Sequence, residues 1–126
     1  MDKLKMVHDF HRIYNAHIGK TAEFPDKETR DLRISLMNEE FNEFLLAEEQ
    51  DDYIGVCDAL ADMLEIIYGT AVSYGMPIDK VFAEVHASNW SKLDADGNPI
   101  YREDGKVLKG PNYFKPDIAR IVKEAK

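Results

Sequence analysis

Segment 51–75, DDYIGVCDALADMLEIIYGTAVSYG, constrains the fold of this 126-residue chain more than any other part of it. When the segment is wound as a helix, apolar side chains point in nearly every direction, so we expect a central helix over 51–73. The charged residues inside this helix are three acids, Asp58, Asp62 and Glu65, spaced four and then three residues apart. That spacing predicts three carboxylates on one face of the helix.

Further segments have helical patterns and together predict an all-α protein. Apolar residues recur at helical spacing over 2–17 and 27–49, and a loop with Gly19 and Pro25 separates these segments. Asp26 is a candidate N-cap for the second of them. Within it, two neighbouring stripes run along the helix: Leu36, Met37, Phe41, Phe44 and Leu45 on one, and Arg33, Glu40, Glu43 and Ala47 on the other.

The last third of the chain has a different pattern. A short helix is expected to begin at Pro77 and end near 88–89, and another is expected over 116–126. Between them lie turn dipeptides, and segments 100–102 and 106–108 around Asp104-Gly105 predict a small β-hairpin. We therefore expect one domain over 1–126: a bundle of four to five helices over about 2–89, followed by an ordered basic hairpin and loop tail over about 90–126.

The distribution of charge excludes several classes of function. The net charge is −8, and residues 1–85 carry 8 Lys or Arg against 18 Asp or Glu, whereas residues 86–126 carry 8 against 6. This balance argues against a nucleic-acid-binding protein, which needs a basic stripe. The longest apolar stretches are too short to span a membrane, so no membrane partner is expected. A single cysteine, Cys57, excludes an internal disulfide, and a cytoplasmic protein is expected.

A second group of acids, Glu39, Glu40 and Glu43, forms the pattern Glu-Glu-x-x-Glu. On an exposed helix such a pattern is commonly a solvated acidic face. Here, however, the acids of the apolar central helix also need a counter-charge, and Arg33 is the only basic residue in 32–79. Divalent cations such as Mg²⁺ favour oxygen ligands of this kind, with water and substrate phosphate completing the shell.

The two groups of acids therefore predict a metal site between facing helices. The expected metal ligands are Glu40, Glu43, Asp58 and Asp62, and the expected catalytic residues are Glu39 and Glu40. Glu39 would bind a further ion or position the attacking water. The cofactor is expected to be Mg²⁺, with Mn²⁺ as an alternative. The chemistry that follows is metal-assisted hydrolysis of a phosphoanhydride, with a free carboxylate as general base.

These motifs resemble a known family, the all-α nucleoside triphosphate pyrophosphohydrolases, which include MazG-like proteins, dimeric dUTPases and phosphoribosyl-ATP pyrophosphohydrolases. NEEFNEF is similar to the first half of the family pattern EExxE…ExxD, and CDALADMLEIIYGTA to the second half in the phosphoribosyl-ATP-pyrophosphohydrolase-like branch. The tail SNWSKLDADGNPIYREDGKVLKGPNYFKPD is similar to the same branch. One departure is Ala59, which stands where the pattern has Glu, so Asp58 or Glu65 would replace that ligand.

The resemblance implies a MazG-like helical homodimer or higher homo-oligomer that cleaves a nucleotide between its α and β phosphates, giving the monophosphate and pyrophosphate. The substrate would be a nucleoside triphosphate, such as dUTP in nucleotide-pool house-cleaning. The tail residues that would bind its phosphates are Asn89, Lys92, Lys109, Asn112 and Tyr113. One alternative is phosphoribosyl-ATP pyrophosphohydrolase of histidine biosynthesis. A second is a non-catalytic helical module for oligomerisation or binding, which would show no Mg²⁺-dependent thermal shift.

Overall fold

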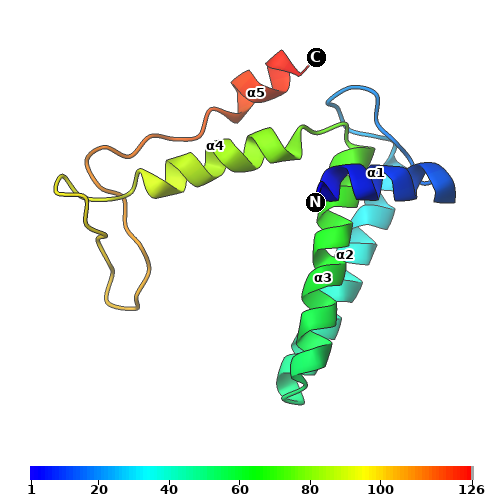
Figure 1. The fold of residues 1–126 in the computed structure, drawn as a ribbon, viewed down its shortest axis with the longest axis horizontal. Coiled ribbons are helices and arrows are strands. Elements are labelled where there is room, and N and C mark those ends of the chain that lie inside the picture. The colour runs from blue at the N-terminus through cyan, green and yellow to red at the C-terminus, as the bar shows by residue number, and fades with distance from the viewer. Residues whose placement is uncertain (126) are drawn as a thin grey trace. The chain divides into compact units, whose positions relative to one another are not determined.

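The computed structural model describes residues 1–125, which form five helices and no strand (Figure 1). The helices are α1 (Lys3–Tyr14), α2 (Lys27–Glu49), α3 (Tyr53–Ser73), α4 (Ile78–Trp90) and α5 (Ile118–Glu124). The contacts divide the chain into two compact units, the first comprising Met1–Met76 and the second beginning at Pro77. The all-α prediction is confirmed, and the expectation of one domain over 1–126 stays a prediction.

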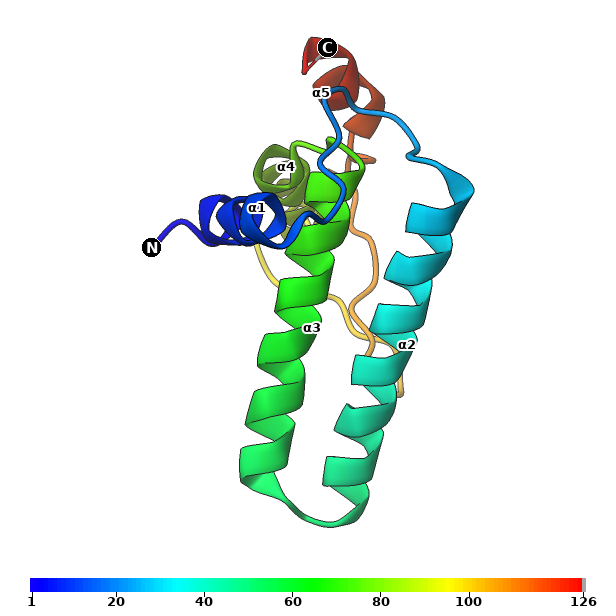
Figure 2. The same cartoon turned by 90° about the vertical axis from the view of Figure 1, so that its right-hand side faces the viewer.

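In the first unit, α2 and α3 run antiparallel and side by side, and α1 packs across α3 (Figures 1 and 2). Asp26 accepts a hydrogen bond from the Thr29 amide at 3.0 Å, which confirms it as the N-cap of α2. Asp52 caps α3 in the same way, through the Gly55 amide at 3.0 Å. These caps satisfy amide groups that the first turn of each helix leaves without a partner.

Packing between α2 and α3 is centred on the stripe that contains Arg33 and Ala47. Both of these residues are buried, whereas Phe41 and Leu45 of the neighbouring apolar stripe are 45% and 47% exposed. The guanidinium of Arg33 donates from Nε to the hydroxyl of Thr70 and from Nη2 to the carbonyl of Ile66, each at 3.1 Å. A long side chain with a hydrogen-bonded head can thus occupy an interface position that its charge alone would not predict.

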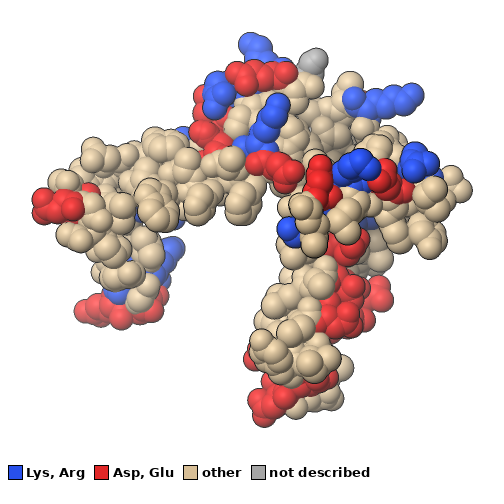
Figure 3. Space-filling view, in the orientation of Figure 1, with Lys and Arg blue, Asp and Glu red and all other residues tan. Residues whose placement is uncertain are grey.

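Many large apolar side chains of α2 and α3 remain exposed within the chain. They are Leu32, Ile34, Phe41, Leu45 and Leu46 on α2, and Tyr53, Ile54, Leu60, Leu64 and Ile67 on α3. Cys57, on the same helix, is exposed as well. Such a set exceeds the singly scattered apolar side chains that are normal on a protein surface, and Figure 3 shows a largely uncharged face along the two long helices.

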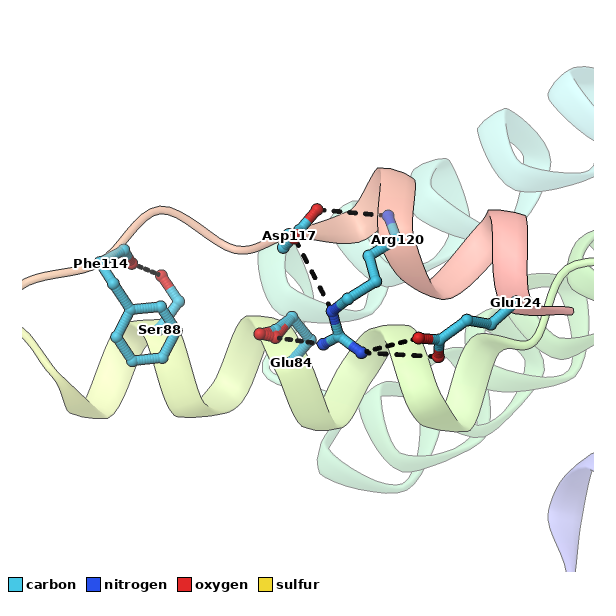
Figure 4. Close-up of polar contacts among 6 residues, drawn as sticks. All are labelled: Glu84, Ser88, Phe114, Asp117, Arg120 and Glu124. Atoms are coloured by element: carbon cyan, nitrogen blue, oxygen red, sulfur yellow. Dashed lines mark hydrogen bonds and ion pairs between the residues drawn. The ribbon is translucent and has the colours of Figure 1, made fainter.

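In the second unit, the salt bridges of Arg120 link α5 to α4 (Figure 4). Its guanidinium lies 3.7 Å from the Glu84 carboxylate on α4 and 3.7 Å from Asp117, and it also contacts Glu124 at 3.5 Å. Glu84 is the only one of these partners that lies on α4, so this ion pair joins the two helices. Because the guanidinium is half exposed, the pair contributes more to the position of α5 than to stability.

The expected β-hairpin is only partly present. A single isolated bridge pairs Tyr101 with Val107, and the Leu108 amide donates to the Ile100 carbonyl at 2.8 Å, so the turn forms but no strand does within residues 1–125. Tyr101 and Val107 are 61% and 43% exposed. Without an apolar layer to cover them, two segments of this length do not sustain a longer ladder.

Helix boundaries differ from the sequence-based expectation at the ends. The first helix was expected over 2–17 but ends at Tyr14, because Asn15 adopts a left-handed conformation (φ 59°) and its amide bonds the His11 carbonyl. This is a common helix stop. None of the helices in 1–125 is both long enough and apolar enough to cross a membrane.

Candidate metal centre

Three carboxylates converge between the two long helices. Glu40 and Glu43 lie one turn apart on α2, and Asp62 lies on α3. One carboxylate oxygen from each side chain falls within 4.8 Å of the other two. The sequence pattern indicated that Glu40 and Glu43 share one face of their helix, because they are three residues apart. Packing of α3 against α2 then adds Asp62 and completes a cluster of oxygen atoms.

The cluster is electrostatically uncompensated. The Oε2 atom of Glu40 is buried and has no hydrogen-bond partner within residues 1–125. Burial, together with the neighbouring carboxylates of Glu43 and Asp62, raises the pKa of Glu40 to about 7. The pKa of Asp62 is also raised, first by burial and then by the charges of Asp58 and Glu43. Three acids in this arrangement repel one another unless a proton or a cation neutralises them.

No basic side chain in the described part of the chain supplies that cation. The ion pairs found over 1–125 include none of the three carboxylates. Arg33, which lies two turns before Glu40 on α2, directs its Nε and Nη2 donors to Thr70 and Ile66 instead.

A hard divalent cation fits this donor set. Mg²⁺ is usually held by one or a few carboxylates, with water and phosphate oxygens in the remaining positions. A buried carboxylate oxygen without a partner is a group that such an ion would satisfy. The residues that could hold the ion are Glu40, Glu43 and Asp62. The arrangement is therefore chemically suited to binding a cation that also binds phosphate.

The other acids predicted for the site lie around this cluster rather than in it. Asp58 is exposed, and its charge raises the pKa of Asp62. Glu39 is exposed, and its charge contributes to the raised pKa of Glu40. Glu65 is exposed and acts on the pKa of His11. None of these three joins the close group formed by Glu40, Glu43 and Asp62.

The predicted phosphate-binding residues all belong to the second unit. Lys92 and Tyr113 are half-buried, and the others, Asn89, Lys109 and Asn112, are exposed. The ammonium group of Lys109 lies 4.8 Å from the centre of the Tyr113 ring, a cation–π contact that joins two of the five. Their roles stay predictions.

Sequence reasoning overlooked the polar group beside α1. His11 and Arg33 are 3% and 7% exposed, and His11 Nδ1 lies 3.1 Å from the carbonyl oxygen of His17. Burial lowers the pKa of His11, which favours the neutral imidazole. One sequence feature could have indicated this group: Arg33 is the only basic residue in 32–79, a segment rich in acids, which favours a structural role for it.

Helices that bring three carboxylates together without a basic partner define an all-α protein with a candidate divalent-metal site. The model of the phosphoribosyl-ATP pyrophosphohydrolase family matches residues 7–89, which contain all three carboxylates. The chain belongs to this family, and the resemblance seen in its motifs is confirmed. No curated protein matches the sequence.

Comparison with solved structures supports the fold. The chain is similar to a crystal structure from Exiguobacterium sp. 255-15, described as that of a candidate NTP pyrophosphohydrolase. The two are 23% identical, the match covers 99% of this chain and 94% of that one, and the TM-score is 0.52. At this level of identity the likeness shows the fold, which is MazG-like and all-α.

Proposed function

We propose that this protein is a Mg²⁺-dependent nucleoside triphosphate pyrophosphohydrolase that cleaves the α–β phosphoanhydride to give a nucleoside monophosphate and pyrophosphate. The observation that carries the proposal is the cluster of Glu40, Glu43 and Asp62, with the buried, unpartnered Oε2 atom of Glu40. The cluster lies in the region matched by a family of pyrophosphohydrolases, enzymes that act on phosphoanhydrides.

In the proposed site, Glu40, Glu43 and Asp62 hold the metal, and Asp58 is the next carboxylate along the same face of α3. When bound, Mg²⁺ polarises phosphate oxygens and neutralises the charge that develops on them; Mn²⁺ is an alternative ion. Asp58 directly precedes Ala59, which stands where the family pattern has a glutamate. Its exposure is compatible with binding a hydrated ion.

Glu39 and Glu40 are the proposed catalytic residues. Glu39 is exposed beside the cluster, where its carboxylate can hold and orient a water molecule. Attack by this water forms an oxygen–phosphorus bond, its proton passes to one of the two carboxylates, and the bridging oxygen departs with the leaving phosphate group. The raised pKa of Glu40 belongs to the metal-free protein, and a bound cation would lower it because positive charge favours the carboxylate.

The proposed substrate is a ribo- or deoxynucleoside triphosphate such as dUTP, with Asn89, Lys92, Lys109, Asn112 and Tyr113 contacting its phosphates. Phosphoribosyl-ATP is a second candidate because the matching family is named for the enzyme that hydrolyses it. We further propose a homodimer or higher homo-oligomer, in which a second copy covers the exposed apolar side chains of α2 and α3.

The test is release of pyrophosphate from a panel of ribo- and deoxynucleoside triphosphates and phosphoribosyl-ATP, with Mg²⁺ and with EDTA. Glu43→Gln removes one proposed ligand and should lower the rate about 100-fold or more, since even outer-shell changes cost 10- to 100-fold. Glu49→Gln is the matched control, because Glu49 is an exposed glutamate at the end of the same helix. It should keep wild-type activity.

Each outcome decides between the functions considered. The substrate that is hydrolysed fastest separates a nucleoside triphosphatase from a phosphoribosyl-ATP enzyme. If the folded protein releases no pyrophosphate from any substrate, or if Glu43→Gln is as active as wild type, the proposed site is wrong. In that case a non-catalytic helical module becomes the better interpretation.

A further inference from the structure

Two segments that are distant in sequence are joined at the C-terminal end of α4. One is 88–93, where the helix ends, and the other is 109–114, which carries KGPNYF. Each segment contains a lysine of the proposed phosphate-binding set, Lys92 in the first and Lys109 in the second. The contacts between the segments lie entirely within the second unit.

Two serines hold the main chain of Phe114. The hydroxyl of Ser88 donates to the Phe114 carbonyl at 2.7 Å, and the Phe114 amide donates to the Ser91 hydroxyl at 3.2 Å. Ser91 in turn donates to the carbonyl of Ser88 at 2.6 Å. Figure 4 shows Ser88 directed from α4 to the segment that passes over it. Because Ser88 is only 2% exposed, its hydrogen bond is shielded from competing water.

Gly110 brings the second segment against the first. A Cβ atom at position 110 would overlap the Leu93 carbonyl oxygen and would lie 2.8 Å from the carbonyl oxygen of Lys92. Both of these neighbours are main-chain atoms, which cannot move aside as a flexible side chain can. Glycine is therefore required for this approach, which brings the main chain just after Lys109 against the main chain of Lys92 and Leu93.

Neither lysine has a carboxylate partner in the described part of the chain. The ion pairs found over 1–125 include neither Lys92 nor Lys109. Lys109 is oriented over the Tyr113 ring by its cation–π contact. An anion with several negative charges can interact with both ammonium groups at once. A chain of phosphates has the charge and the acceptor oxygens to do so.

We infer that Ser88, Ser91 and Gly110 are positioning residues that hold Lys92 and Lys109 as one polyphosphate-binding surface. This inference rests on the proposed function for its place in a reaction, but binding of inorganic pyrophosphate tests it without any catalysis. The serines do not contact the phosphates themselves. They fix the segment that carries Lys109 and Tyr113, so their loss weakens substrate binding without altering the reacting groups.

The first test is Ser91→Ala in the full chain. Loss of the hydroxyl removes one hydrogen bond to Phe114. Because a neutral hydrogen bond of this kind is lost, we expect the affinity for inorganic pyrophosphate to fall by about three- to tenfold. Titration calorimetry with inorganic pyrophosphate in EDTA should show this rise in Kd. In the turnover assay, KM should rise by the same factor with kcat unchanged. Hydrogen exchange at the Phe114 amide should accelerate.

Two variants separate positioning from general damage. Ser91→Thr keeps the hydroxyl and should restore wild-type pyrophosphate binding, whereas Ser35→Ala removes an exposed serine of α2 and should change nothing. Gly110→Ala should weaken binding at least as much as Ser91→Ala. The helical circular dichroism of all variants should match that of wild type.

The outcomes are separate from those of the proposed function. If wild-type protein releases pyrophosphate from no nucleotide but binds inorganic pyrophosphate more tightly than Ser91→Ala does, the positioning role stands and the catalytic proposal fails. If wild-type protein does not bind inorganic pyrophosphate, or if Ser91→Ala binds it as wild type does, the positioning role is overturned. A fall in kcat at unchanged KM would overturn it as well.

Discussion

Replacing Gly69 with alanine tests the packing of the buried arginine. Gly69 lies in α3, where a Cβ atom would overlap Nη2 of Arg33, lie 3.1 Å from Cζ of the same side chain and lie 2.8 Å from Nε2 of His11. Both neighbouring side chains are more than nine-tenths buried. The guanidinium can leave only by giving up its hydrogen bonds to Ile66 and Thr70.

The expected magnitude is the balance of three effects. Inserting a carbon into a packed site costs about 1–3 kcal/mol. Losing a hydrogen bond of a charged group costs about 1.5–3 kcal/mol more. Alanine in place of glycine inside a helix returns about 1 kcal/mol. Gly69→Ala should therefore lower the free energy of unfolding by about 1.5–5 kcal/mol, which corresponds to a fall in Tm of about 6–20 °C for a chain of this length.

The assay is urea unfolding followed by circular dichroism, with a double-mutant cycle as the control. In an Arg33→Ala background the alanine at position 69 has room, and His11 can shift into the vacated space. There Gly69→Ala should be neutral or stabilising by about 1 kcal/mol, so the coupling energy should be about 1.5–6 kcal/mol. If Gly69→Ala stabilises the protein by about 1 kcal/mol in both backgrounds, helix propensity alone operates and the described packing of Arg33 is wrong.

Three further perturbations have defined outcomes. Because the pKa of Glu40 is raised in the folded state to about 7, metal-free protein should lose stability as the pH rises from about 4.5 through 7. Urea midpoints measured in EDTA should show this loss, and Glu40→Gln should reduce the dependence of the midpoint on pH. Asp52→Ala removes the cap on the Gly55 amide and should cost about 1 kcal/mol by urea unfolding; an unchanged midpoint would contradict the capping role. Ser73→Ala removes a buried hydroxyl that donates to the His17 carbonyl at 2.9 Å and should cost about 1 kcal/mol in the same assay, whereas no change would mean that water replaces it.

Local signals predicted the helices well because each carries its own periodicity and caps. The second helix was expected over 27–49 and is found at those residues, with Asp26 as its N-cap. The first helix ends three residues early because Asn15 takes a left-handed conformation, which a run of apolar spacing does not reveal. The hairpin turn was foreseen at Asp104-Gly105, but a strand needs neighbours to cover it, and these depend on tertiary structure.

The acidic cluster could be anticipated because helical spacing determines which carboxylates share a face. Glu40, Glu43 and Asp62 were all among the expected ligands, and the structure brings them together. Sequence patterns did not indicate that the stripe with Arg33 would be the one against α3, since a charged residue is normally assigned to solvent. Nor did they reveal the serine contacts with Phe114, because hydroxyl groups carry no periodic signal.

The unpartnered carboxylate of Glu40 has a consequence for how such a chain evolves and how it can be engineered. In the metal-free protein this buried oxygen opposes folding, so a neutral side chain of similar size at position 40 should give a more stable protein. Selection for thermal stability alone would therefore remove Glu40, whereas under the proposed function selection for metal-dependent catalysis would retain it. A library screened only for heat resistance should accumulate neutral residues at this position and, under the proposed function, lose activity as it does so.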